Sequence, residues 1–148
     1  MRFLTDSMLG TLGNWLRLLG YDTAMAAAEP DAVLVRLARA EDRIILTRDR
    51  ELAAHRGVLA LLIRDDDLDR QLAQVAHDLP LPAPQPGSRC PHCNARLQEA
   101  SKEAVAGQVP PYVLRSHDTF RRCPECGRVY WRGTHWEGIE EKLAVVSG

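Results

Sequence analysis

The chain has 148 residues, of which 45% are apolar and 26% are charged, and its formal net charge is −1. This composition can build a hydrophobic core, which excludes a wholly disordered chain. The balanced charge excludes a protein that binds nucleic acid through bulk positive charge alone. The longest purely apolar run, residues 58–63, is far too short to cross a bilayer.

The first part of the chain begins with strand and helix patterns in alternation. Residues 2–5 predict a strand, and the apolar side chains of residues 8–19 recur at helical spacing. Gly20 follows directly and is a typical C-terminal cap. Residues 21–25 are a weaker strand candidate, and residues 33–38 give a second helical face.

The same alternation continues to residue 79. Residues 43–47 form an apolar, β-branched run that is typical of a strand buried on both faces. A short helix is expected over residues 49–55, a strand over residues 58–63, and a helix whose apolar face starts at Leu68. Strands and helices in this order predict an α/β fold, with a parallel sheet flanked by helices.

The stretch from residue 80 to residue 87 contains four prolines and cannot form a regular element. We therefore predict a first domain over residues 1–80, a proline-rich linker over residues 81–88 and a second domain over residues 89–148.

The second domain carries two C-x-x-C knuckles, formed by Cys90 with Cys93 and by Cys123 with Cys126. Four thiolates presented by two tight turns suit tetrahedral zinc and leave no position open for a substrate. We therefore expect a structural zinc in a small ribbon, although the spacing also allows iron. The alternative is a thiol–disulfide redox motif, which would follow a strand and open a helix, whereas prolines precede this one.

The cysteines also bear on location. Paired thiols in a cytosolic protein are more often metal ligands than disulfides. Residues 1–8 contain no signal-peptide pattern. We therefore expect a cytoplasmic protein with no membrane partner.

Carboxylates follow several strands of the predicted sheet. Asp6 comes directly after the first strand, Asp31 begins the second helix, and Asp49 lies two residues beyond the buried strand. Ligands of an open parallel sheet bind beyond the carboxyl ends of its strands, where these acids could share Mg²⁺ or Mn²⁺. Aspartate is also a preferred N-cap, and helix capping alone would explain any one of the three.

Other side chains are candidates for substrate binding. Arg17 and Arg48 could contact phosphates near the acids, or simply pair with them. Trp131, His135 and Trp136 could stack on unpaired bases, or form the core of the ribbon. A basic stripe, either a phosphate-binding or a solubilising surface, contains Arg115, Arg121, Arg122, Arg128 and Arg132.

Segments spread in order over nearly the whole chain resemble one known family. They are Phe3–Gly10, Trp15–Asp22, Arg43–Asp49, Arg89–Asn94 and Phe120–Trp136. Together they resemble the Mut-seven C-terminal ribonuclease family, in which a PIN-like nuclease domain is joined to a zinc ribbon.

This resemblance implies a compact PIN-like sheet and a metal-dependent endoribonuclease that acts on RNA. Asp6 matches the acid after the family's first strand, and Asp49 matches the acid of its Thr-x-Asp segment. Asp31 is the candidate third ligand for Mg²⁺ or Mn²⁺, and Arg122 and Trp136 are candidates for holding the substrate.

Two other functions stay open at this point. Full PIN domains usually add a helical glutamate and a fourth acid, for which this chain has no obvious counterpart. The alternative is therefore a non-catalytic RNA-binding or ribosome-associated zinc-ribbon adaptor. A protein–protein interaction module is a third possibility. The sequence does not predict the oligomeric state.

Overall fold

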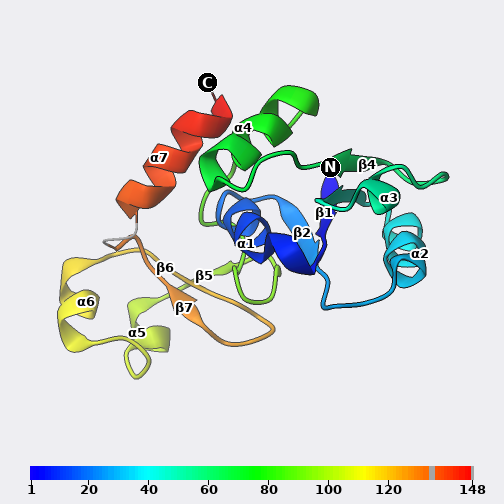
Figure 1. Ribbon diagram of the computed structural model, residues 1–148. Coiled ribbons are helices and arrows are strands. Elements are labelled where there is room, and N and C mark those ends of the chain that lie inside the picture. The colour runs from blue at the N-terminus through cyan, green and yellow to red at the C-terminus, as the bar shows by residue number, and fades with distance from the viewer. Residues whose placement is uncertain (134–135, 148) are drawn as a thin grey trace.

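The computed structural model describes residues 1–133 and 136–147 (Figure 1). The prediction of an α/β fold is confirmed, and each strand and helix expected up to residue 79 is present. These elements are β1 (Arg2–Thr5), a short 3-10 helix η1 (Ser7–Leu9), α1 (Gly10–Leu18), β2 (Asp22–Met25), α2 (Asp31–Glu41), β3 (Ile44–Thr47), α3 (Arg50–Ala53), β4 (Ala60–Leu62) and α4 (Leu68–Asp78).

The four strands form one parallel sheet in the order β2-β1-β3-β4. Successive strand residues point to opposite faces, so each central strand contributes side chains to two hydrophobic cores. Phe3 and Leu46 pack with α1 and α4 on one face. Leu4 and Ile45 pack with α2 and α3 on the other face. This two-sided burial explains why the sequence of β3 is continuously apolar.

Two glycines allow close contacts on α1. Gly20 has a φ of +98°, which ends the helix, and a Cβ there would lie 2.3 Å from the carbonyl oxygen of Gln85. A Cβ on Gly13 would lie 2.9 Å from both Thr5 Oγ1 and Met25 Cγ. The helix therefore lies directly against the carboxyl ends of β1 and β2.

The second half of the chain forms a small antiparallel sheet in the order β5-β6-β7. Phe120 and three valines of the surrounding segments form its own core. The elements are β5 (Gln98–Ala100), α5 (Lys102–Val105), α6 (Pro111–Ser116), β6 (Phe120–Arg122), β7 (Val129–Tyr130) and α7 (Trp136–Ser147).

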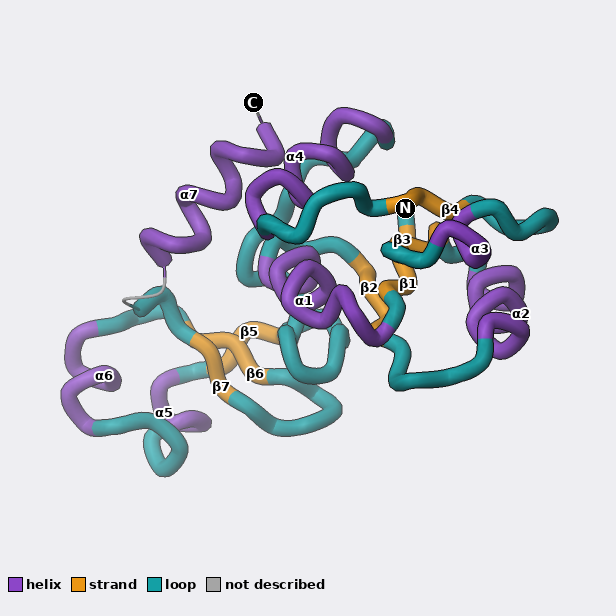
Figure 2. The backbone as a smooth tube through the Cα atoms, in the orientation of Figure 1, coloured by secondary structure: helices purple, strands orange, loops and turns teal. Residues whose placement is uncertain are grey.

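The last helix, α7, returns to the first half of the chain. It lies beside α4 (Figures 1 and 2), and Ile139 is buried in the same core as α1 and α4. The proline-rich segment also binds the first half, since the Tyr21 hydroxyl donates to Pro82 O at 2.8 Å and Gln85 N donates to Leu19 O at 2.9 Å. The domain boundaries at residues 80 and 89 stay a prediction.

In the described part of the chain, no helix is both long enough and apolar enough to span a membrane.

Candidate functional site

Asp6 lies at the carboxyl edge of the parallel sheet, where β1 passes into η1. Its side chain is only 9% exposed. One carboxylate oxygen accepts a hydrogen bond from Met8 N at 3.0 Å, and thereby caps η1. The other accepts hydrogen bonds from the Thr47 hydroxyl at 2.5 Å and from Arg48 N at 3.4 Å. These three donors fix the carboxylate in one orientation at the sheet edge.

Asp49 reaches the same place from β3. Its backbone N–H donates to Thr47 Oγ1 at 2.9 Å, so one hydroxyl binds both Asp6 and Asp49. The Asp49 carboxylate is exposed and accepts from Glu51 N at 2.9 Å, which caps α3. Thr47, the threonine of the Thr-x-Asp segment, is not among the site residues predicted from the sequence. Its hydroxyl joins the Asp6 carboxylate to the backbone of Asp49.

Asp31 and Arg48 occupy different positions around this edge. Asp31 is the first residue of α2 and is half-buried, and Pro30, not Asp31, is the N-cap. Arg48 directs its guanidinium to the Asp65 carbonyl at 2.5 Å and to the Ile63 carbonyl at 3.5 Å. Arg48 thus joins the ends of β3 and β4 and brings a positive charge to the acidic edge.

The cysteine quartet, Cys90, Cys93, Cys123 and Cys126, has the geometry of a metal site. Its four sulfur atoms all lie within 4.8 Å of one another. Among residues 1–133 and 136–147, it is the only group of three or more such side chains close enough to share an ion. The quartet could hold a metal such as zinc. Asp6, Asp31 and Asp49 do not form a group of this kind.

Distances within the quartet fit zinc. Cys90 Sγ and Cys126 Sγ are 3.8 Å apart, and a regular tetrahedron with Zn–S bonds of about 2.3 Å has edges of about 3.8 Å. Each knuckle also turns a backbone N–H toward its first sulfur, from Cys93 to Cys90 at 3.4 Å and from Cys126 to Cys123 at 3.5 Å. The Tyr130 hydroxyl lies 3.1 Å from Cys90 Sγ and can donate to it.

The thiols influence one another strongly. Desolvation and the neighbouring Cys126 sulfur raise the pKa of Cys93 to about 12. The backbone N–H of Arg128, followed by its guanidinium, lowers the pKa of Cys126 to about 6. Without a cation, the quartet would therefore hold protons unequally, because four thiolates this close repel one another.

The first knuckle is attached to the outer edge of the parallel sheet. Asn94, with a φ of +68°, accepts from Thr23 N at 3.0 Å and donates to Asp22 Oδ1 at 2.7 Å. Arg17 donates to Thr23 O at 2.8 Å, to Pro91 O at 3.0 Å and to the carbonyl of the next residue at 3.2 Å. Burial lowers the pKa of Arg17. The side chain of Arg17 thus holds the knuckle and β2 together.

The remaining substrate candidates lie in the ribbon. Arg122 donates to Ala104 O at 2.7 Å and to Gln108 Oε1 at 2.5 Å. Trp136 opens α7, and Arg132 lies over its ring at 4.3 Å. His135 lies outside the described residues. Arg122 and Trp136 are therefore in different surroundings, and the neighbour of Arg122 on β6, Arg121, lines a cavity with Trp136.

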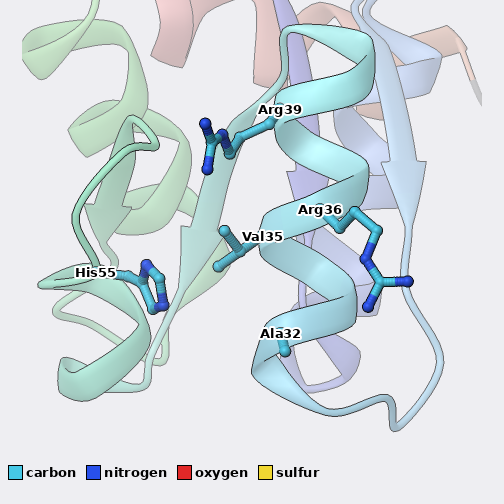
Figure 3. Close-up of a pocket in the computed structure, with 5 residues that line it drawn as sticks. All are labelled: Ala32, Val35, Arg36, Arg39 and His55. Carbon is cyan, nitrogen blue, oxygen red and sulfur yellow. The ribbon is translucent and has the colours of Figure 1, made fainter.

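Another cavity, of about 410 Å³, lies between α2 and the end of α3. Figure 3 shows Arg39 and His55 approaching this gap from its two sides with Val35 between them, whereas Arg36 points to the other side of α2. The lining contains neither a carboxylate nor an aromatic ring that could stack on a base, apart from the imidazole of His55. It is a basic groove on the face of the sheet opposite α1 and α4.

The fold and the sites define a class of protein: a parallel α/β sheet, with acids at its carboxyl edge and a four-cysteine site that could hold zinc. The family model of the Mut7-C RNAse domain matches residues 1–143, and the chain belongs to this family. Membership indicates a ribonuclease-type function with RNA as the substrate. No curated protein and no solved structure matches the chain significantly.

Proposed function

We propose that the protein is an endoribonuclease that hydrolyses RNA phosphodiester bonds with Mg²⁺ or Mn²⁺ at the carboxyl edge of its PIN-like sheet. Asp6 and Asp49 would hold the ion, whereas Asp31 does not lie close enough to both of them to be a third ligand in this arrangement. The observation that carries the proposal is the Thr47 hydroxyl, which donates to the Asp6 carboxylate and accepts from the backbone N–H of Asp49 at the edge where parallel sheets bind their ligands.

The available oxygen atoms fit a hard divalent cation. A carboxylate has about four lone-pair directions, and the three donors around Asp6 leave one of them free. The exposed Asp49 carboxylate uses one oxygen for its cap on Glu51. Mg²⁺ usually keeps several waters and needs only one or two carboxylates besides the substrate phosphate. The carboxylates of Asp6 and Asp49, whose residues are linked through the Thr47 hydroxyl, would therefore suffice for such a site.

Each residue of this edge has a task in the proposed reaction. A bound Mg²⁺ or Mn²⁺ would supply the means to activate water and to stabilise the leaving oxygen. Thr47 and the N–H of Met8 hold the Asp6 carboxylate in place. Arg48, fixed to the Asp65 carbonyl, brings a guanidinium near the scissile phosphate. Arg17 contributes indirectly, by holding the ribbon against β2.

The ribbon would aid substrate binding. Zinc in the cysteine quartet would fix its two knuckles, and the arginines of β6 and of the segment after β7 would supply charge for RNA phosphates. The Arg122 guanidinium donates to Ala104 O and Gln108 Oε1 within the ribbon, so its charge is fixed on one face of the small sheet. Trp136 offers an aromatic ring at the junction with α7.

Asp49→Asn is the cleanest test of this proposal. The amide oxygen can still accept from Glu51 N, so the cap on α3 survives while the negative charge is lost. Asp6→Asn is harder to interpret, because its amide nitrogen can face the donating N–H of Arg48, and the variant then loses a hydrogen bond as well as the charge. We expect Asp49→Asn to reduce cleavage of total RNA in Mg²⁺ or Mn²⁺ by about 100-fold or more.

The matched control is Asp42→Asn. Asp42 is the C-terminal cap of α2, with a φ of +54°, a conformation that asparagine adopts readily, and it lies at the opposite end of that helix from Asp31. This control should cleave as wild type. Cleavage by Asp49→Asn and Asp6→Asn at the wild-type rate would refute the proposal.

One observation favours a second candidate, the non-catalytic RNA-binding adaptor. Asp6 and Asp49 both cap helices, and in the described chain no group of three ligating side chains includes either of them. The adaptor predicts that purified wild-type protein binds RNA but leaves it intact across Mg²⁺, Mn²⁺ and other divalent ions. Metal-dependent cleavage that Asp49→Asn abolishes would exclude it.

A further inference from the structure

A cavity of about 500 Å³ lies where the ribbon meets the start of α7. Its walls come from three separate parts of the chain: the end of the proline-rich segment, the ribbon around β6 and β7, and the first residue of α7. It shares no residue with the acidic edge. A volume of this size is within the range of sites that bind small ligands such as a nucleotide.

Aromatic rings and guanidinium groups line this cavity together. Trp131 and Trp136 both contribute to the wall, and Arg132 lies over the ring of Trp136 at 4.3 Å. Arg121 donates to Gly87 O at 2.6 Å. A Cβ on Gly87 would lie 3.8 Å from the Arg121 guanidinium and 3.9 Å from the Trp136 ring, so these two groups meet at one point. These are ordinary van der Waals distances, and the φ of +75° at Gly87, not a lack of space, is what favours glycine there.

One polar atom of a lining residue has no hydrogen-bond partner among residues 1–133 and 136–147. The indole nitrogen of Trp136 is fully buried and has no hydrogen-bond acceptor among the described residues. A buried indole N–H normally finds an acceptor, because leaving it unpaired is costly. The nitrogen is not exposed to the cavity in this structure, so an oxygen of a bound ligand would supply the acceptor only after the ring rotates.

The charge of the cavity favours an anionic ligand. Arg121 and Arg132 both line it, and Arg132 is partly neutralised by Glu140 at 3.3 Å. The acid in the lining, Asp118, has a side chain that is 97% exposed and pairs with Lys102 at 3.2 Å. Positive charge beside flat aromatic faces is the combination that proteins use for the phosphate and the base of an unpaired nucleotide.

We propose that this cavity binds one unpaired nucleotide of RNA, with the base against the rings of Trp131 and Trp136 and the phosphate against Arg121 and Arg132. The cavity accepts the base only when it is out of a duplex, so the protein prefers single-stranded RNA. That the ligand is RNA rests on the proposed function, but binding in the cavity does not require the acidic edge or cleavage.

The first test uses the three tryptophans of the chain as separate reporters. Heteronuclear NMR gives one indole N–H signal for each, and Trp136→Phe and Trp131→Phe assign them. Titration of the full-length, zinc-loaded protein with AMP and with UMP should shift the Trp136 and Trp131 signals and leave that of Trp15 in place. Equal shifts from inorganic phosphate alone would make the cavity a simple anion site and would overturn the proposal, as would no shift at Trp136.

The second test measures binding of a fluorescent single-stranded oligonucleotide and of a hairpin with the same composition, without added Mg²⁺ or Mn²⁺. Replacing both Arg121 and Arg132 by alanine should weaken single-strand binding about tenfold or more. Arg115→Ala removes a charge from the exposed surface of the same ribbon, outside the cavity, and should change it less than about twofold. The proposal would be refuted if the double variant and Arg115→Ala lost single-strand affinity equally. A preference of the wild-type protein for the hairpin would also refute it.

These results are independent of those that test cleavage. If Asp49→Asn still cleaves RNA while the cavity variants lose binding, the acidic-edge mechanism fails and the nucleotide cavity stands. If the cavity variants bind as wild type while Asp49→Asn is inactive, the cavity fails and the ribonuclease stands. Circular dichroism of each variant checks that Arg121→Ala, which removes the bond to Gly87, remains folded.

Discussion

Asn94 offers the most direct test of how the ribbon with the four cysteines is attached to the parallel sheet. It follows the first knuckle and binds β2 through both ends of its amide, accepting from Thr23 N and donating to Asp22 Oδ1. Its φ of +68° lies in the left-handed region, which asparagine tolerates better than alanine. Asn94→Ala therefore removes two hydrogen bonds and introduces backbone strain in one step.

The expected cost follows from the surroundings of the two partners. Thr23 is completely buried, and a buried N–H without an acceptor costs about 1–3 kcal/mol. Asp22 keeps its bonds to Arg2 and Arg43, and its side chain is 19% exposed. A hydrogen bond to a charged group contributes about 1.5–3 kcal/mol, and we expect the loss of the bond from Asn94 to lie at the low end of this range. Alanine at positive φ adds about 1 kcal/mol. Since such contributions are not additive, we expect a loss of about 3 kcal/mol in unfolding free energy.

The assay is equilibrium urea unfolding of the zinc-loaded protein, followed by tryptophan fluorescence. Asn94→Gly is the matched control, because glycine loses the same two hydrogen bonds but adopts positive φ without strain. It should be about 1 kcal/mol more stable than Asn94→Ala. A loss below about 0.5 kcal/mol for Asn94→Ala, or a glycine variant less stable than the alanine variant, would refute this account of the attachment.

Three further predictions concern packing, metal and pH. Gly13→Ala places a Cβ 2.9 Å from Thr5 Oγ1 and Met25 Cγ, and thermal unfolding should show a loss of about 1–3 kcal/mol. Removing the metal from the cysteine quartet with a strong chelator should abolish the near-ultraviolet circular dichroism of the ribbon, and zinc should restore it; an unchanged spectrum after proven metal loss contradicts the site. Burial opposes ionisation of Asp22, but Asn94 and Arg43 lower its pKa overall, so its contribution to stability is present above about pH 4 and is lost as the pH falls further. Urea midpoints of Asp22→Asn should consequently vary less between about pH 4 and pH 2 than those of wild type.

Much of the parallel sheet could be predicted from the sequence because its signals are local. Each central strand is a short apolar run, and α1 ends at Gly20, whose φ of +98° matches the expected cap. The return of α7 to α4 could not be predicted in this way. Ile139 enters the core of α1 and α4 from a distant part of the chain, and helical periodicity shows that a helix has an apolar face but not which core that face joins.

The candidate sites likewise differ in whether a local sequence pattern predicts them. Asp6 and Asp49 follow strands of a parallel sheet, which placed both at its carboxyl edge, and the C-x-x-C spacing predicted the quartet. No comparable pattern predicts the role of Asn94, whose two partners on β2 lie far back in the chain. It likewise could not separate Arg121 from Arg122: on a strand these two point to opposite faces, and only the arrangement of α7 decides which face has a cavity.

The attachment at β2 links the four-cysteine ribbon to the strand next to the acidic edge. β2 is an outer strand of the parallel sheet, and such strands leave backbone groups without partners. At Thr23, Asn94 accepts from the N–H and Arg17 donates to the carbonyl, and Arg17 also binds the Pro91 carbonyl of the knuckle. If the knuckle unfolds, Thr23 loses the acceptor for its N–H, and Arg17 loses its anchor. Since β2 pairs directly with β1, and Asp6 follows the last residue of β1, the parallel sheet itself connects Thr23 with the acidic edge.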